Sequence, residues 1–152
     1  MELDKTDKHI LNILQVDAKI TNAALAQKIN LSPAATLERV RKLEQYEIVI
    51  NYHAKIDYVK LGFFSEIIAG VQLNRATSEN IKLLKTTIDK ITLITTCYQV
   101  VGGFDFILMV KSKDMNSYQH MVIEKLYMLD IIKDIQTLSV TQLLKNKPIT
   151  FE

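Results

Sequence analysis

The sequence predicts an α+β chain made of a three-helix unit and a following unit with the element order β-α-β-β-α-β. Two observations carry this prediction. Residues 21–45 place apolar side chains at helical spacing on either side of a short polar turn. After residue 62 the pattern changes to short apolar runs, which alternate with capped helices and include a Gly-Gly pair. The order β-α-β-β-α-β is that of the ferredoxin-like fold.

The first predicted helix runs from about Asp4 to Val16. Asp4 is a good N-cap, and Asp7 places a negative charge in the first turn, where the helix dipole favours it. The face that we expect to be buried carries Ile10, Leu11 and Leu14.

The second helix begins after Thr21, whose hydroxyl can accept a hydrogen bond from an amide one turn later. It ends at Asn30, because asparagine tolerates the left-handed conformation that a sharp turn needs. Leu31 then supplies an apolar side chain within the turn. The buried face should carry Leu25, Ala26 and Ile29.

The third helix opens with Ser32 as its N-cap and Pro33 in the first turn. The spacing predicts that Leu37, Val40 and Leu43 face inward. The opposite face carries Ala34, Ala35, Glu38, Arg41, Lys42 and Gln45, with Arg39 on the flank. In a helix-turn-helix the outward face of the second helix enters the major groove of DNA, whereas an ordinary pair of amphipathic helices exposes this face only to solvent.

The remaining elements follow from β-branched runs and turn signals. Residues 48–56 are expected to form a strand that leaves the helical unit as a wing or arm, and residues 57–62 a hinge that ends at a glycine. Ser78 and Asp114 are the expected caps of two helices, and Gly102-Gly103 the expected tight turn of a hairpin. Strands are expected at 63–73, 93–101, 104–110 and within 131–144. The predicted domains are residues 1–50, a linker at 51–62 and residues 63–152.

Some of these strands are apolar on both faces, notably the runs 67–69 and 106–110. The two helices of a four-stranded sheet of this kind cover only one of its faces, and the other face must also be covered. We therefore expect a second copy of the chain to pack on the open face. The rival interpretation is that the N-terminal helices of the same chain cover it.

The composition limits what the chain can be. Its 152 residues are 48% hydrophobic, which is enough for one core or two small ones. The formal net charge is only +2, with 9 Lys+Arg against 8 Asp+Glu in residues 1–62, so a DNA-binding role would need several linked copies. Cys97 is the only cysteine, and we see neither a signal peptide nor an apolar run that could cross a bilayer, so we expect a cytoplasmic protein without a membrane partner.

The run from Leu31 to Glu44, LSPAATLERVRKLE, closely resembles the recognition helix of the Lrp/AsnC family of bacterial and archaeal transcription regulators. The resemblance extends from Leu3 to about Leu144. Its second motif, Val101–Asp105, is similar to the family's Gly-x-aromatic-Asp hairpin. The resemblance implies a winged-type helix-turn-helix on double-stranded DNA. It also implies a second domain that forms homodimers, often octamers, and binds a small amino acid between dimers, without enzyme activity, a metal or a cofactor.

The resemblance also implies roles for particular residues. DNA contacts are expected from Ser32, Ala34, Ala35, Thr36, Glu38, Arg39, Arg41 and Lys42, with the cations on phosphates or guanines. Effector contacts are expected from Gly102, Gly103, Asp105, Thr137 and Ser139. An amino acid needs an acceptor for its ammonium, which Asp105 offers, and donors for its carboxylate, which glycine amides bring close. The alternative is that the two glycines only turn the hairpin and Asp105 only fixes it.

Three departures from the family pattern stand out. Glu47 replaces a glycine that often follows the recognition helix, so the helix exit is expected to differ. Asp130-Ile131 replaces a Pro-Gly before the last strand, near the expected effector site, which bears on the identity of the effector. Ala34 and Ala35 offer no hydrogen bonds to bases, which favours weak sequence specificity or readout of DNA shape.

Two other functions fit the same architecture. Siroheme decarboxylases resemble this family, and such an enzyme would need a proton donor, for which His53 and His120 are the candidates. The third hypothesis is an effector-binding chain that acts only through a DNA-binding paralogue. Neither the three histidines nor Cys97 has the spacing of a metal site, and Cys97 is expected to be a small buried apolar residue.

Overall fold

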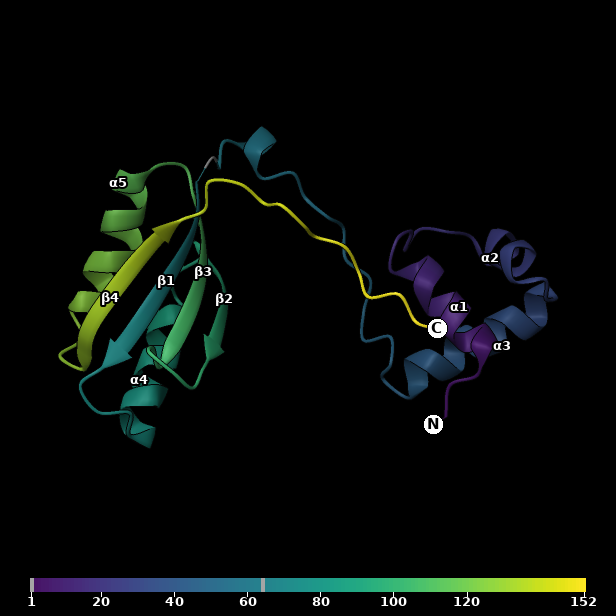
Figure 1. Ribbon diagram of the computed structural model, residues 1–152, viewed down its shortest axis with the longest axis horizontal. Coiled ribbons are helices and arrows are strands. Elements are labelled where there is room, and N and C mark those ends of the chain that lie inside the picture. The colour runs from purple at the N-terminus through teal and green to yellow at the C-terminus, as the bar shows by residue number, and fades with distance from the viewer. Residues whose placement is uncertain (1, 64) are drawn as a thin grey trace. The chain divides into compact units, whose positions relative to one another are not determined.

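The computed structural model describes residues 2–63 and 65–152, which form two compact units. One unit contains Met1–Lys55 together with Leu144–Glu152, and the other contains Ile56–Leu143. Figure 1 labels most of their helices and strands. The prediction assigned all of residues 63–152 to one domain. By their contacts the last nine residues group with the helical unit, because they bind α1 as described below, and the predicted domain bounds stay a prediction.

The helical unit contains α1 (Lys5–Leu14), α2 (Asn22–Ile29) and α3 (Pro33–Gln45). Its core is small, and partly buried side chains such as Val40 and Val49 surround it. The buried members are Ile10, Leu11, Leu25, Ile29 and Leu43. The predicted buried stripes of α1 and α2 are therefore largely confirmed, with Leu14 only partly buried.

The N-terminus of α1 is closed by a reciprocal pair of aspartates. The Asp7 amide donates to the Asp4 carboxylate (2.8 Å), and the Asp4 amide donates to the Asp7 carboxylate (3.2 Å). This capping box satisfies two amides that have no partner within the helix. It also buries Asp7, which is 4% exposed.

The strand predicted at residues 48–56 does not form in the single chain. These residues have no regular secondary structure, and Ile50 is 83% exposed. An extended segment becomes a strand only when a neighbouring backbone accepts and donates its ladder hydrogen bonds, and this chain places no partner strand there. The 3-10 turn η1 (Val59–Leu61) follows, just before Gly62.

The second unit has the predicted β-α-β-β-α-β order. Its strands are β1 (Ser65–Leu73), β2 (Ile94–Gln99), β3 (Phe106–Ser112) and β4 (Ile132–Ser139), arranged antiparallel in the order β2-β3-β1-β4. The predicted first strand included Phe64, which lies outside the described residues. The strands β2 and β4 form the edges of the sheet.

Two helical segments connect the strands. Helix α4 (Ser78–Ile88) is capped by Thr77, one residue before the predicted cap, because its hydroxyl is the one that accepts from the Asn80 amide (3.2 Å). The second segment begins at the predicted cap, Asp114. It comprises α5 (Met115–Tyr118), a π-helical turn (Gln119–Ile123) and α6 (Glu124–Tyr127).

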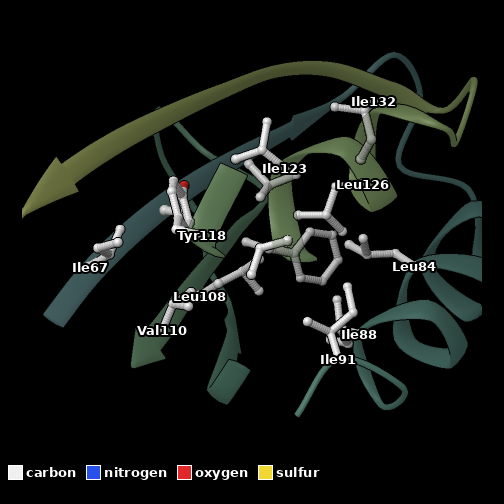
Figure 2. Packing of buried hydrophobic residues seen from close by; sticks show 14 of the residues in the cluster. Ile67, Leu84, Ile88, Ile91, Leu108, Val110, Tyr118, Ile123, Leu126 and Ile132 are labelled. Atoms are coloured by element: carbon white, nitrogen blue, oxygen red, sulfur yellow. The ribbon is translucent and has the colours of Figure 1, made fainter. Parts of the chain in front are cut away.

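One face of the sheet and both helical segments enclose the main core. Alternate residues of β1 and β3 point into it, so Ile67 and Leu108 are fully buried members of a cluster that also contains Leu84, Tyr118 and Leu126. Figure 2 shows Ile67 at the Tyr118 end of this cluster and Leu84 at the other end. The alternation follows from the two-residue period of a strand.

The other face of the sheet carries apolar side chains that the helices of this unit do not cover. Ile68, Ile107 and Met109 are only partly buried, and Leu138 is 55% exposed. This observation agrees with the prediction that the strands are apolar on both faces. The ring of Phe104 lies against Gly70, where a Cβ atom would stand 2.7 Å from three of its carbons, so the glycine makes room for the ring.

Candidate nucleic-acid interface and ligand site

The turn between α2 and α3 is built from two helix ends. Asn30 has the predicted left-handed conformation (φ 55°, ψ 44°), and the Leu31 amide donates back to the Ala26 carbonyl (3.0 Å). The Ser32 hydroxyl then caps α3 by accepting from the Ala35 amide (3.2 Å). The Asn22 side chain joins the two helices by donating to the Pro33 carbonyl (2.8 Å). These contacts fix how α3 leaves the turn.

Helix α3 presents most of the predicted DNA-contact residues to solvent. Ser32, Ala34, Glu38, Arg41 and Lys42 are exposed, and Ala35 and Arg39 are partly buried.

The inward face of α3 differs from the prediction at two positions. Thr36 is fully buried, and its hydroxyl donates to the Ser32 carbonyl (2.9 Å), so its side chain does not face the solvent. Leu37 was expected inside but is 39% exposed. The inward face therefore runs through Thr36, Val40 and Leu43. It differs from the predicted face only at its first position, where Thr36 takes the place of Leu37.

Arg39 is held within the helical unit. Its Nη1 lies 2.7 Å from the carboxylates of both Asp4 and Asp7. The bond to Asp7, followed by that to Asp4, raises the pKa of the Arg39 guanidinium. The pKa of Asp4 is lowered, chiefly by the Asp7 amide and then by Arg39. The ion pair ties α3 to the start of α1, and it competes with any phosphate for this guanidinium.

The other two cations of α3 are more available. Lys42 lies 3.3 Å from Glu38 in an exposed pair one turn apart, which contributes little. Arg41 is exposed and has no acidic partner within 4.0 Å among the described residues. Arg41 is therefore the cation of α3 best placed to meet a phosphate or a guanine.

The C-terminus of α3 is closed despite the departure at Glu47. Glu47 itself adopts the left-handed conformation (φ 55°), the Glu47 amide donates to Glu44, and the Ile48 amide donates to Leu43, both at 2.9 Å. This is the hydrogen-bond pattern of a Schellman motif, with glutamate in the left-handed position where glycine is usual. Tyr52 then donates its hydroxyl to Glu44 (2.8 Å). Burial and the Glu44 carboxylate raise the pKa of Tyr52 to about 12.

The loop between β2 and β3 is longer than the predicted two-residue turn. It spans residues 100–105, since Gln99 and Phe106 are the last paired residues. Asp105 is bonded to both neighbouring strands: its amide donates to Val71 (2.9 Å), its Oδ2 accepts from the Leu73 amide (2.7 Å), and its carbonyl accepts from the Val100 amide (2.9 Å). These bonds fix Asp105 between the end of β1 and the residue after β2.

Three segments meet at the end of β1. Gly103 lies at the tip of the β2–β3 loop and accepts a hydrogen bond from the Gln72 side chain. Asn74 bonds the turn before β4 twice, from its amide to Ile131 (2.8 Å) and from its side chain to Asp130 (2.9 Å). Only the loop was expected from the sequence. The contacts of Asn74 join residues far apart in the chain, which no local pattern indicates.

The structure does not bring all five predicted effector residues together in one subunit. Gly102, Gly103 and Asp105 belong to the loop near Leu73. Thr137 pairs with Ala69 and Ser139 with Ile67, which are four and six residues along β1 from Leu73. At about 3.3 Å per residue these positions are roughly 13 and 20 Å away. The Thr137 hydroxyl is also bonded to the buried Tyr118 hydroxyl (2.8 Å), a contact that the sequence did not indicate.

The remaining chemistry-bearing side chains are separate. Within residues 2–63 and 65–152 no group of three His, Cys, Asp or Glu side chains is placed to hold a metal ion. His120 pairs with Glu124 (2.8 Å), one turn along the same helical segment. Cys97 is partly buried on β2, and burial followed by the charge of Asp89 raises the pKa of its thiol. No helix in the described part of the chain is long and apolar enough to span a bilayer.

Comparison with known proteins gives matches over nearly the whole chain. Residues 3–44 match the AsnC-type helix-turn-helix domain, and residues 66–149 match the Lrp/AsnC ligand binding domain. The chain is 36% identical over 135 residues to the transcriptional regulator AzlB of Bacillus subtilis (strain 168), covering 89% of this chain and 86% of that protein. It is 33% identical over 144 residues to the leucine-responsive regulatory protein of Escherichia coli (strain K12), covering 95% and 88%.

Solved structures agree with these matches. The transcriptional regulator NMB0573 of Neisseria meningitidis, solved as its L-Met complex, superposes with a TM-score of 0.92 at 26% identity, covering 99% of this chain and 97% of that one. The structure of E. coli AsnC has a TM-score of 0.88 at 23% identity, covering 99% of both chains, and so supports the fold.

Proposed function

The chain belongs to the Lrp/AsnC family of DNA-binding transcriptional regulators, and we propose that its α3 reads duplex DNA while a small amino acid on the sheet unit changes how copies of the chain assemble. The observation that carries the DNA contact is the exposed outer face of α3, on which Arg41 has no acidic partner among the described residues. Ser32, Ala34, Ala35, Glu38 and Lys42 complete this face.

Two of the expected DNA contacts change role in this proposal. Thr36 shapes the start of α3 from inside, and Arg39 clamps α3 to α1. With Ala34 and Ala35 at the front of the helix, few side chains can bond to base edges. We therefore propose that readout rests largely on backbone contacts and DNA shape.

The assembly that we propose is a homodimer, which builds further into octamers. The half-buried apolar side chains on the open face of the sheet, Ile68, Ile107, Met109 and Leu138, support a partner surface there. The weak charge of the chain supports the same conclusion, because only several linked DNA-binding units would together neutralise enough phosphates for firm binding.

The effector site that we propose centres on the β2–β3 loop. Asp105 uses Oδ2 for the Leu73 amide, and its Oδ1 has no hydrogen-bond partner among the described residues, so it is available to an ammonium group. Gly102 has φ 149° and faces no atom within 4 Å of a Cβ position, so a carboxylate can approach its backbone. Thr137 and Ser139 are too far along the sheet to join the same ligand, so they would have to come from a neighbouring subunit. The NMB0573–L-Met complex supports an amino acid as the ligand class.

A thermal-shift screen against the twenty amino acids tests the effector part. A ligand selective for the folded state raises the melting temperature, and Asp105→Asn should abolish that rise while keeping an oxygen for the Leu73 amide. Asp89→Asn, an exposed change of the same kind at the end of α4, is the matched control and should leave the rise unchanged. No rise with any amino acid, or an undiminished rise in Asp105→Asn, contradicts the proposed site.

Binding of the isolated chain to duplex DNA tests the regulator itself. Binding excludes a chain that acts only through a DNA-binding paralogue. The relatives are named as transcriptional regulators, which supports a regulator rather than a siroheme decarboxylase. A tetrapyrrole titration followed at the Soret band separates these two, because a regulator should leave the spectrum unchanged. A protein that acts on chromosomal DNA belongs in the cytoplasm, where we place this chain.

A further inference from the structure

The last nine residues, Leu144–Glu152, leave the sheet unit after β4 and belong to the helical unit. Figure 1 shows this yellow end of the chain beside α1. The Val140 amide still donates to the Glu66 carbonyl (2.8 Å), so the chain follows β1 up to that residue. Residues 141–148 then connect the sheet to the contacts on α1.

Two polar side chains bind the backbone of this segment: Asn12 on α1 and Gln15 directly after its end. Asn12 makes a reciprocal pair with Phe151: its Nδ2 donates to the Phe151 carbonyl and its Oδ1 accepts from the Phe151 amide, both at 2.9 Å. The Gln15 side chain donates to the Ile149 carbonyl (3.1 Å). Asn12 and Gln15 are three residues apart and so share a helix face, and Ile149 and Phe151 are two apart and so share one side of an extended chain.

The Phe151 side chain supplies an apolar anchor. It lines a pocket of about 370 Å³ together with Leu11, Leu14, Ala18, Ile48 and Ile50. Phe151 is 37% exposed, whereas Leu144 is 84% and Ile149 75% exposed. The backbone of this segment is paired with carboxamides, and the Phe151 ring forms part of the wall of an apolar hollow. Together these contacts form a peptide-binding arrangement whose ligand is the chain's own end.

We propose that residues 144–152 are a tethered peptide ligand of α1, a strap that holds the DNA-binding unit at a second point. The segment from α3 to β1 is one connection between this unit and the sheet unit, and the bound strap makes a second. We call the contact surface of the strap on α1 the seat. While the strap is bound there, the distance from Val140 to the seat cannot exceed the reach of the nine residues from Val140 to Ile149, about 30 Å. This restraint orders the DNA-binding unit before it meets DNA, which reduces the entropy lost on binding.

The strap is also suited to release. Its contacts are three hydrogen bonds of exposed groups and one half-buried ring, and the tether rather than the strength of these contacts keeps the seat occupied. Release of the strap should therefore weaken DNA binding without unfolding either unit. The effect on DNA binding rests on the proposed function, whereas the binding of the strap to α1 does not.

The seat is tested with tryptophan fluorescence in the full chain, which contains no natural tryptophan. In Phe151→Trp the indole should resist acrylamide quenching more than in Thr150→Trp, because Thr150 makes none of these contacts. Adding Asn12→Ala should raise the quenching of Phe151→Trp to the Thr150→Trp level, and adding His9→Ala, an exposed change on α1, should not. Equal quenching at positions 150 and 151, or no effect of Asn12→Ala, overturns the seat.

A second measurement needs no bulky probe. In the unsubstituted chain, backbone NMR signals of residues 145–152 should be as broad as those of the folded units. In Asn12→Ala they should become sharp and move to random-coil positions. Sharp signals already present in the unsubstituted chain overturn the proposal.

The functional consequence is tested by DNA affinity. Asn12→Ala and Phe151→Ala should each weaken duplex binding about three- to tenfold, the scale expected when a preorganising restraint is removed, while His9→Ala and Thr150→Ala leave it unchanged. If quenching and NMR show that the strap binds α1, but duplex affinity in Asn12→Ala and Phe151→Ala is unchanged or rises, the proposed restraint is refuted. If the unsubstituted chain binds no duplex at all, the proposed function fails, and the quenching and NMR measurements still test whether the strap binds α1.

Discussion

Replacing Arg39 with alanine separates a clamp from a DNA contact. The guanidinium bonds Asp7 at 2.7 Å, and the Asp7 side chain is 5% exposed. Without Arg39 this carboxylate keeps only the Asp4 amide as a partner at 3.2 Å. A hydrogen bond to a charged group contributes about 1.5–3 kcal/mol, and since the Arg39 side chain is one-third exposed we expect the unfolding free energy to fall by about 2 kcal/mol. We assign no energy to the exposed Asp4.

This change should lower the melting temperature of the helical unit by about 8–16 °C, at roughly 4–8 °C per kcal/mol for a domain of this size. Calorimetry of Arg39→Ala, Asp7→Asn and the double variant gives their coupling energy, which should approach the same 2 kcal/mol. Arg41→Ala is the control and should change stability by less than about 0.5 kcal/mol. An unchanged melting temperature in Arg39→Ala, together with DNA binding weakened as much as in Arg41→Ala, would refute the clamp.

Three further results are expected. Glu47→Gly should raise stability by about 0.5–1 kcal/mol, because it removes left-handed strain at φ 55°, whereas Glu47→Ala should not; equal unfolding midpoints for the two variants would contradict the strain. Gly70→Ala should cost about 1–3 kcal/mol by displacing the Phe104 ring, and an equal cost in a Phe104→Ala background would exclude that ring as the cause. The fold lowers the pKa values of Asp4 and Asp114, so their stabilisation is present above the unfolded value near 3.8 and is lost as the pH falls through the folded values. In acid titration, Asp4→Asn/Asp114→Asn should show a flatter decline in stability than the unsubstituted chain. An unchanged curve would be evidence against this contribution.

The sequence predicted what depends on nearby residues. Asp4, Thr21 and Ser32 cap their helices as expected, because a short polar side chain reaches an amide three residues away. Asn30 takes the left-handed conformation for which asparagine is suited. The order of strands and helices followed from periodicity and gave the correct topology class.

Partners distant in sequence account for most of the differences. A strand at 48–56 needs a neighbouring backbone that this chain does not place there. Asp105, at the end of the loop 100–105, bonds to Leu73, which lies 32 residues earlier. The strap joins Asn12 to Phe151, 139 residues apart. No local pattern contains these pairings.

On the candidate DNA interface, the sequence identified the helix but not the role of each side chain. Periodicity alone places Thr36 and Leu37 within 100° of each other around the helix, and the bond of Thr36 to Ser32 decides which one is buried. Arg39 looked equivalent to Arg41 until the position of Asp7 was known.

The most direct test of DNA binding by α3 is the salt dependence of duplex affinity in Arg41→Ala/Lys42→Ala, followed by fluorescence anisotropy. Lys90→Ala/Lys133→Ala is the matched control, because it removes two exposed cations of the sheet unit and leaves the same net charge. We predict that the α3 variant binds all sequences more weakly, while the control behaves as the unsubstituted chain. The slope of log K against log salt should fall by about one for each phosphate that the α3 variant no longer neutralises. Equal affinities and slopes for the two variants would contradict the claim that α3 binds DNA.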